Sequence, residues 1–249
     1  MGPSNGAIYN PENTKFQAFG SKSWVVQKYI ENPLLIINRK FDIRAWVLVA
    51  SWNPLQIYLY KDCYIRFSAS DYDPKNVKNL FMHLTNNSIS KHCSEKQTSY
   101  FAENMWSLDQ FKTYLSSQFQ KEELWESKLL PQMKDIIKLS MLSAWSKVDW
   151  RENSIGLYGY DVLIDSDLKM WLLEINLCPT MEHSTKVTKH LVPKMMEDLC
   201  KVIIDGKELP EEGIKKSTGD YDLIYEGVRV REALKNKTDF CIEGRRITK

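Results

Sequence analysis

Long apolar runs are missing from this 249-residue sequence. No stretch approaches the roughly 20 consecutive apolar residues that a membrane-spanning helix needs. The opening segment MGPSNGAIYNPENTKFQ also lacks the apolar h-region of a secretory signal. We therefore expect no membrane span, no secretion and a cytoplasmic location.

Cysteine is scarce and scattered. The five cysteines show no C-x-x-C spacing and stand far apart in the chain, as Cys63, Cys93, Cys178, Cys200 and Cys241. An odd and dispersed set argues against a disulfide framework and against a zinc site, and it fits a reducing compartment.

A strong excess of charge of either sign is absent as well. The 34 basic and 32 acidic residues give a net charge of +2, which is too mild to indicate a nucleic-acid partner, although a local basic patch could meet an acidic protein. With 43% hydrophobic and 27% charged residues, the composition is that of a soluble globular protein. The length allows one large domain or two small ones.

The first third of the chain is rich in β-branched and aromatic residues. Residues 24–30 read as a buried strand, 34–51 as a long β-rich segment and 56–68 as its returning strand. The Asn53-Pro54 pair between the last two is a turn signal, so we expect an antiparallel pair. Residues 71–96 are polar and predict irregular structure.

Helical periodicity begins after this irregular stretch. Ser107 followed by Gln110 is a capping-box pattern in front of an apolar run, and 128–148 carries apolar residues at helical spacing. Residues 159–176 predict a β-hairpin around Ser166 and Asp167, and 186–202 predict another helix. This order of hairpin, helices, hairpin and helix predicts an α+β fold of antiparallel hairpins packed with helices.

The second hairpin places acids beside an apolar run. Because strand side chains alternate, Glu174 and Asn176 share one face, together with Leu172. If Asp165 pairs with Met170, Asp161 lies directly opposite Glu174. Two facing carboxylates repel each other, and a divalent cation removes the repulsion.

Oxygen-only ligands suit a hard cation such as Mg²⁺. The alternative is a solvated sheet edge that merely tolerates acids. Large apolar residues flank Glu174 on both faces, so we expect it to be buried and favour the metal.

A second polar stripe lies on the long strand. Lys40, Asp42 and Arg44 share one face, and Arg66 on the returning strand is expected to point to the same side. Such a stripe alone could be plain surface. Three cations converging near a magnesium site, however, suit phosphate oxygens and the charge that develops in phosphoryl transfer.

The segment MHLTNNSISK supplies His83, Thr85, Asn86 and Asn87. These short polar side chains could form Asx-turns only, or they could position a substrate. One histidine in a loop does not by itself indicate a general base.

These segments together resemble a known family. WVVQKYI, KFDIRAWVLV, YIRFS, HLTNNSISK, GYDVLID and WLLEIN stand in the order and at the spacing of the tubulin tyrosine ligase-like enzymes, from about Trp24 to Asn176. The resemblance implies an ATP-grasp fold and a ligase that joins an amino acid to a glutamate-rich tubulin tail, with ATP and Mg²⁺ as cofactors.

The resemblance also implies a role for each matching residue. The segment that meets adenine and the nearby strand would bind ATP through Gln27, Lys28, Tyr29, Ile30, Lys40 and Asp42. The substrate and phosphate contacts would be Lys40, Asp42, Arg44, Arg66, Thr85 and Asn86. The Mg²⁺ ligands would be Asp161, Glu174 and Asn176, and Arg44, Arg66 and Glu174 would act in catalysis.

The downstream segments PTMEHSTKVTKHLVPKMMEDLCKVIIDG and YDLIYEG look most like the glycylase branch. The resemblance then implies that a tubulin glutamate γ-carboxylate attacks the γ-phosphate of ATP, and that the amine of glycine displaces phosphate from the acyl phosphate. A polyglutamylase, or a catalytically incomplete fragment that only binds tubulin or a partner, remain as alternatives. The expected protein is a monomer of the cytoplasm and cytoskeleton, including the axoneme of cilia and flagella, and binds neither nucleic acid nor membrane.

Three regions are expected along the chain: a polar segment 1–22, a partial ATP-grasp catalytic domain 23–205 and a charged C-terminal extension 206–249. The family's upstream lysine strand and Gly-rich loop are not found, so we expect a C-terminal portion of a larger enzyme. Basic residues of the extension could face acidic tubulin tails, but a solvated face is favoured; they are Lys215, Lys216, Arg229, Arg231, Lys235, Lys237, Arg245 and Arg246.

Overall fold

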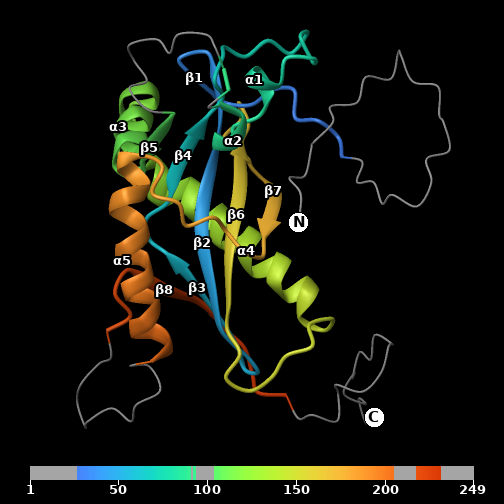
Figure 1. Ribbon diagram of the computed structural model, residues 1–249, viewed down its shortest axis with the longest axis vertical. Coiled ribbons are helices and arrows are strands. Elements are labelled where there is room, and N and C mark those ends of the chain that lie inside the picture. Colours follow the sequence, from blue (N-terminus) through green and yellow to red (C-terminus); the bar gives the residue numbers. More distant parts are fainter. Residues whose placement is uncertain (1–26, 91, 94–103, 205–216, 231–249) are drawn as a thin grey trace, which may run out of the picture.

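The computed structural model describes residues 27–90, 92–93, 104–204 and 217–230 (Figure 1). The expected N-terminal segment 1–22 and most of the extension 206–249 lie outside these residues. The strands are β1 Leu35–Ile36, β2 Arg39–Trp52, β3 Leu55–Tyr60, β4 Tyr64–Phe67, β5 Met105–Ser107, β6 Gly156–Ile164, β7 Met170–Asn176 and β8 Tyr221–Glu226. The helices are α1 Leu80–His83, α2 Asn87–Ser90, α3 Leu108–Phe119, the π-helical turn η2 Trp125–Leu129, α4 Leu130–Trp145 and α5 Lys186–Ile203.

The sheet is built around the long strand β2. Its neighbours β1, β3, β4 and β6 all pair with it antiparallel. The strand order β5-β4-β2-β3-β8 continues on the other side of β2 through β6 to β7. An antiparallel sheet covered by helices confirms the expected α+β, ATP-grasp-like class. No helix in the described part of the chain combines the length and the apolar character needed to cross a bilayer.

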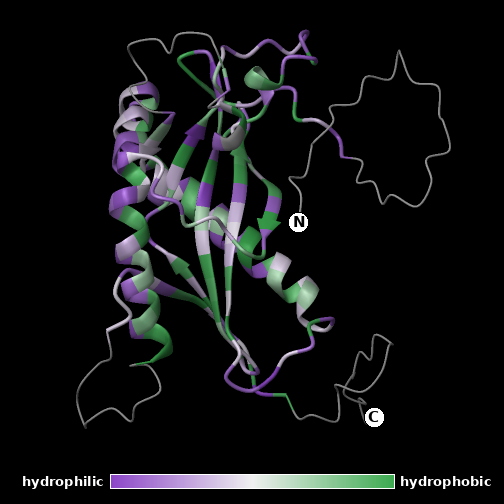
Figure 2. Cartoon of the chain, viewed as in Figure 1, coloured by the Kyte–Doolittle hydropathy of each residue, from purple (hydrophilic) through white to green (hydrophobic). Residues whose placement is uncertain are grey.

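Alternation along β2 divides the core into two layers. Phe41, Ile43 and Val47 point to a large apolar cluster that includes residues of α3, η2 and α4. Trp46 and Leu48 point to the other face, where α5 packs. On that second face the first half of β2 is polar, and Figure 2 shows hydrophilic segments side by side on the upper halves of β4, β2 and β6. One face of the sheet is therefore apolar at one end and charged at the other.

The predicted capping box begins α3. The Ser107 hydroxyl accepts from the Gln110 amide at 3.3 Å, and the Gln110 side chain accepts from the Ser107 amide at 2.9 Å. These bonds satisfy two amides that have no partner inside the helix. The helix expected over 186–202 is confirmed as α5, and that expected over 128–148 is η2 followed by α4.

Ser107→Ala is expected to lower the free energy of unfolding by about 1 kcal/mol, because it removes the acceptor at the start of α3. Urea denaturation followed by circular dichroism measures this change. Ser116→Ala on the same helix is the matched control, since this half-buried residue lies inside the helix and caps nothing, and equal effects of the two substitutions would contradict the capping role.

Some elements differ from expectation. Residues 27–30 of the strand expected over 24–30 have no regular structure, and 24–26 lie outside the described residues. The single returning strand expected over 56–68 is two strands, β3 and β4, which pair with different halves of β2. The irregular stretch 71–96 contains the four-residue helices α1 and α2.

The extension contributes β8 to the sheet. β8 pairs antiparallel with β3. At its entrance the buried Asp198 carboxylate of α5 accepts from the Tyr60 hydroxyl at 3.3 Å, the Asp220 amide at 3.1 Å and the Lys201 ammonium at 2.8 Å. Gly219 has a φ of +57°, and a Cβ there would lie 2.0 Å from an Asp198 oxygen. Only glycine fits this turn, which fastens β8 to α5.

The hairpin register corrects two expectations and confirms one. Ile164, and not Asp165, pairs with Met170, because Asp165 belongs to the turn and donates its amide to Lys169. A bulge between Asp161 and Val162 takes up the extra residue, so Asp161 still lies opposite Glu174. Leu172 pairs with Val162 and therefore does not share the face of Glu174.

Candidate active site

The charged end of the sheet is assembled by strand register. Arg66 on β4 is directly opposite Asp42 on β2, Arg44 is opposite Asp161 on β6, and Asp161 is opposite Glu174 on β7. Directly opposite residues point to the same face of a sheet. Four strands therefore bring these five side chains into one charged row, and the predicted metal ligand Asn176, which is opposite Gly159, follows two residues after Glu174 on β7.

Arg66 is held by a buried ion pair. Its Nε and Nη2 donate to the two oxygens of Asp42 at 2.8 and 2.6 Å, and the Thr85 hydroxyl donates to Asp42 Oδ2 at 2.7 Å. All three residues are buried. A bidentate pair of this kind fixes the plane of the guanidinium as well as its place.

Asp161 joins both arginines. It accepts from Arg44 Nε at 2.5 Å and from Arg66 Nη2 at 2.9 Å, and the Asn176 amide lies 3.4 Å away. Burial opposes its ionisation, but the guanidinium groups of Arg66 and Arg44 hold the pKa of Asp161 below its usual range. Burial likewise opposes the charged form of Arg66, but Asp42 and Asp161 raise its pKa. Asp161 and Arg66 are therefore both charged at neutral pH.

Glu174 is exposed, which corrects the expectation that it is buried. β7 pairs only with β6 among the described residues, and its apolar residues Trp171 and Leu172 are 38% and 37% exposed. The apolar residues around Glu174 therefore mark an edge strand. No hydrogen bond or ion pair within the described part of the chain engages its carboxylate.

The predicted metal ligands offer the chemical type of atom that Mg²⁺ binds. Asp161, Glu174 and Asn176 offer two carboxylates and one amide, which are the oxygen donors that this ion takes. No cluster of three or more His, Cys, Asp or Glu side chains arranged for a metal occurs in the described ranges, and the predicted set has only two such side chains. Arg44 and Arg66 supply positive charge to Asp161 in the structure. The magnesium assignment stays a prediction.

Lys40 lies beside the row, on the same face of β2 and two residues before Asp42. It is 7% exposed, its ammonium donates to the Tyr29 hydroxyl at 3.2 Å, and it stands 4.7 Å from the centre of the Tyr29 ring. Burial lowers the pKa of Lys40 to about 8, although the charge of Asp42 acts in the opposite direction. A cation so poorly hydrated is well suited to bind an anion.

Lys40→Met is expected to reduce the rise of stability between about pH 8 and pH 10. In this range the unfolded chain, with a lysine pKa of about 10.4, binds more protons than the folded one. The free energy of unfolding therefore rises with pH, by up to about 1.4 kcal/mol per pH unit. Methionine keeps the length without the charge, so urea denaturation of both proteins across this range isolates the contribution of Lys40.

Burial raises the pKa of the Cys63 thiol, so this group makes the free energy of unfolding fall as the pH rises. Wild type and Lys40→Met share this contribution, and it cancels in their difference. A stability difference between wild type and Lys40→Met that does not change with pH would contradict the low pKa of Lys40.

The other predicted residues are not part of the buried network. Gln27 and Lys28 are exposed, and the Lys28 ammonium pairs with Glu31. Asn86 is exposed, and its carbonyl accepts from two amides of α2. Ile30 is half-buried. The structure thus brings Lys40, the Asp42 network and the hairpin acids together, while these four residues lie at its margin.

A covering segment was not anticipated from the sequence. The residues between β7 and α5 cross in front of β6, β2 and β4 (Figure 1). A Cβ on Gly159 would lie 2.8 Å from Pro179 Cβ and 3.3 Å from Arg44 Cδ. The absence of a side chain at Gly159 lets this segment approach the network closely, and Cys-Pro-Thr in the sequence gave no signal of it.

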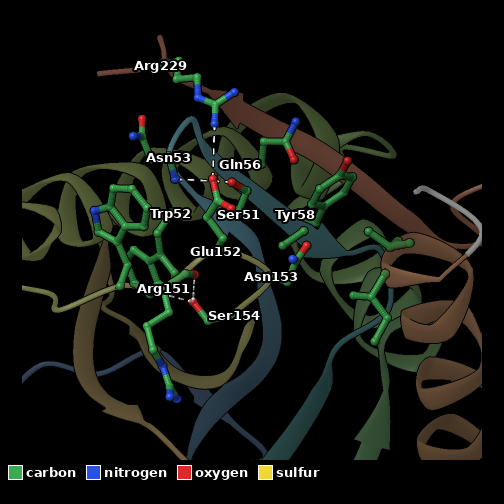
Figure 3. A pocket seen from close by; sticks show the side chains of 14 residues that line it. Ser51, Trp52, Asn53, Gln56, Tyr58, Arg151, Glu152, Asn153, Ser154 and Arg229 are labelled. Carbon is green, nitrogen blue, oxygen red and sulfur yellow. Dashed lines mark hydrogen bonds and ion pairs between the residues drawn. The ribbon is translucent and has the colours of Figure 1, made fainter. Parts of the chain in front are cut away.

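A cavity of the described chain lies elsewhere. It has a volume of about 420 Å³ and is lined by the β2–β3 turn, residues 150–154, the end of α5 and Arg229. Figure 3 shows Arg229 reaching across to Glu152, an ion pair of 3.5 Å. None of the predicted site residues lines this cavity, so we place the candidate site by the buried network instead.

Comparison with known proteins finds several similar sequences. Tubulin glycylase 3D of Tetrahymena thermophila is 43% identical over 230 residues, covering 88% of this chain and 22% of the relative. Tubulin monoglycylase TTLL3 of Danio rerio is 40% identical over 224 residues (89% and 28%), and Protein monoglycylase TTLL8 of Mus musculus is 39% identical over 231 residues (92% and 27%). The chain thus spans between a fifth and a third of the length of these relatives.

A match to a protein family covers most of the chain. The sequence model of the Tubulin-tyrosine ligase family matches residues 8–210, which include β1 to β7, all of the described helices and every predicted site residue. The chain therefore belongs to the tubulin-tyrosine ligase family.

Proposed function

We propose that this chain is part of a tubulin glycine ligase, which uses ATP and Mg²⁺ to add glycine to the γ-carboxyl of glutamates in tubulin tails. The observation that carries the proposal is the similarity to several relatives that are named tubulin glycylases or monoglycylases, at 39–43% identity over most of the chain. The proposed location is the cytoskeleton, including the axoneme of cilia and flagella.

The charged row supports a ligase of this kind. Asp161, Glu174 and Asn176 would hold Mg²⁺, which shields the negative charge of the ATP phosphates when it is bound. Arg44 and Arg66 provide two guanidinium groups beside those ligands. The pairs with Asp42 and Asp161 fix both groups before a substrate arrives, so little reorganisation is needed as negative charge develops.

The remaining predicted contacts would position the substrates. Lys40 would meet phosphate or carboxylate oxygens, and residues 27–30 would lie along the base of the nucleotide. Thr85 acts through Asp42 on Arg66, and Asn86 stands exposed beside it.

The proposed reaction has two steps, and each transferred group is accounted for. A glutamate γ-carboxylate of tubulin takes the γ-phosphoryl group of ATP and releases ADP, which leaves an acyl phosphate. The amine of glycine then attacks the acyl carbon, forms the amide, and releases phosphate and a proton. The protein's own contribution is orientation and fixed charge, without a covalent enzyme intermediate.

The test uses the complete enzyme that contains this chain. Incubation with tubulin, Mg²⁺-ATP and either labelled glycine or labelled glutamate should label tubulin with glycine. Tubulin from which the C-terminal tails have been removed is the control and should stay unlabelled. Incorporation of glutamate alone would make the protein a polyglutamylase, and incorporation of neither, together with tubulin binding, would leave a binding function only.

A further inference from the structure

His83 is a buried residue that the proposed reaction does not use. It ends helix α1 and is 2% exposed. Its ring contacts the edges of two tyrosines, with centroids 5.6 Å from Tyr29 and 5.5 Å from Tyr72. Both ring nitrogens have partners: Nδ1 lies 2.7 Å from the Tyr29 hydroxyl, and Nε2 lies 3.0 Å from the Asn76 carbonyl.

The partners impose one direction on these hydrogen bonds. The Asn76 carbonyl can only accept, so Nε2 must carry a proton. In the neutral ring Nδ1 is then an acceptor, and the Tyr29 hydroxyl must donate to it. The Tyr29 oxygen is thereby left to accept from the Lys40 ammonium, which stands 3.2 Å away. The result is a directed relay from Lys40 through Tyr29 to His83.

The relay connects three distant parts of the sequence. Lys40 belongs to β2, Tyr29 precedes β1, and His83 lies 54 residues beyond Tyr29. A second tyrosine supports the same arrangement, since the Tyr72 hydroxyl donates to the Glu31 carbonyl at 2.9 Å. The segment around Tyr29 is therefore held from one side by His83 and Tyr72.

We propose that His83 is a positioning residue of the nucleotide site: it fixes the Tyr29 hydroxyl, which in turn fixes the ammonium of Lys40. The proposal rests on the nucleotide role given above to Lys40 and Tyr29. A buried polar group whose partner is removed loses its orientation. Loss of the His83 acceptor therefore weakens the contact of Lys40 with the nucleotide, although His83 itself does not touch the nucleotide.

Three single variants of the full chain separate this role from a merely structural one. Tyr29→Phe removes the middle of the relay and keeps the ring. His83→Leu fills the site without an acceptor, while His83→Asn keeps an oxygen near the position of Nδ1. The two His83 variants are matched, since leucine and asparagine are nearly isosteric.

The first measurement is the titration of Lys40 by NMR of its side-chain carbon next to the ammonium, without nucleotide. The resonance is assigned by its loss in Lys40→Met. We expect Tyr29→Phe and His83→Leu to lower the pKa of Lys40 further, because the ammonium loses its oriented acceptor, and His83→Asn to restore it. Equal titration of Lys40 in wild type and all three variants would overturn the proposal.

The second measurement is the affinity for Mg²⁺-ATP. We expect His83→Leu to weaken binding about tenfold, and the double variant with Tyr29→Phe to lose no more than Tyr29→Phe alone. If the double variant instead loses affinity by the product of the two single losses, the two residues act independently and the relay is overturned, while the ATP-binding role of the site is kept. Absence of ATP binding by wild type, with the expected Lys40 titrations, would overturn the proposed function instead.

Discussion

Glu174→Gln is expected to lower the rate of ligation by the complete enzyme at least about 100-fold while leaving the fold intact. The substitution removes one of the two carboxylates of the proposed magnesium site and keeps the size of the side chain. Glu174 is exposed on β7, and its carboxylate forms no hydrogen bond or ion pair in the described part of the chain. We therefore expect the free energy of unfolding to change by less than about 0.5 kcal/mol.

The matched control for this variant is Asp167→Asn. It makes the same change from carboxylate to amide on an exposed residue of the same hairpin, at the turn and away from Asp161. Incorporation of labelled glycine into tubulin is measured at saturating Mg²⁺ for both variants. Turnover of Glu174→Gln close to that of Asp167→Asn would remove Glu174 from the metal site.

Arg66→Met is expected to lower the free energy of unfolding by about 3–5 kcal/mol. Arg66 is 6% exposed and is shared by two buried acids. Without it, the Thr85 hydroxyl is the one remaining hydrogen-bond donor to the Asp42 carboxylate among the described residues, and Arg44 is the one remaining ion-pair partner of Asp161 there. Methionine fills much of the volume of the arginine side chain. The loss of stability therefore measures the cost of leaving buried negative charge without a partner. Urea denaturation at neutral pH gives the value.

Lys61→Met is the control for this second prediction. Lys61 is exposed and lies 3.8 Å from both Asp220 and Asp222, so its removal should cost less than about 1 kcal/mol. Adding Asp42→Leu to Arg66→Met should recover part of the loss, because it removes one uncompensated acid. A cost for Arg66→Met as small as that for Lys61→Met would show that the network contributes little to stability.

Strand alternation made much of the site predictable. The stripe of Lys40, Asp42 and Arg44 required only a period of two along one strand. Asp161 and Glu174 also face each other as expected, although the hairpin turn is one residue longer at Asp165. A β-bulge restored the register, and neither the additional turn residue nor the bulge had a signal in the sequence.

Other features depend on contacts between distant residues. Whether Glu174 is buried depends on what lies beside β7. A run of apolar residues does not distinguish a strand at the edge of a sheet from a strand in its interior. The contact of His83 with Tyr29 likewise follows from packing and not from spacing. β8 was missed because its six residues lie in a charged tail of weak periodicity, and only pairing with β3 makes them a strand.

The fastening of β8 to α5 has a consequence for the order in which a nascent chain can finish folding. Until residues 219–226 have left the ribosome, β3 presents an open hydrogen-bonding edge, and Asp198 lacks the Asp220 amide. An open strand edge is a template for pairing with another chain. Synthesis that stalls after α5 is therefore expected to leave an aggregation-prone intermediate, which the arrival of one late strand converts into the finished sheet.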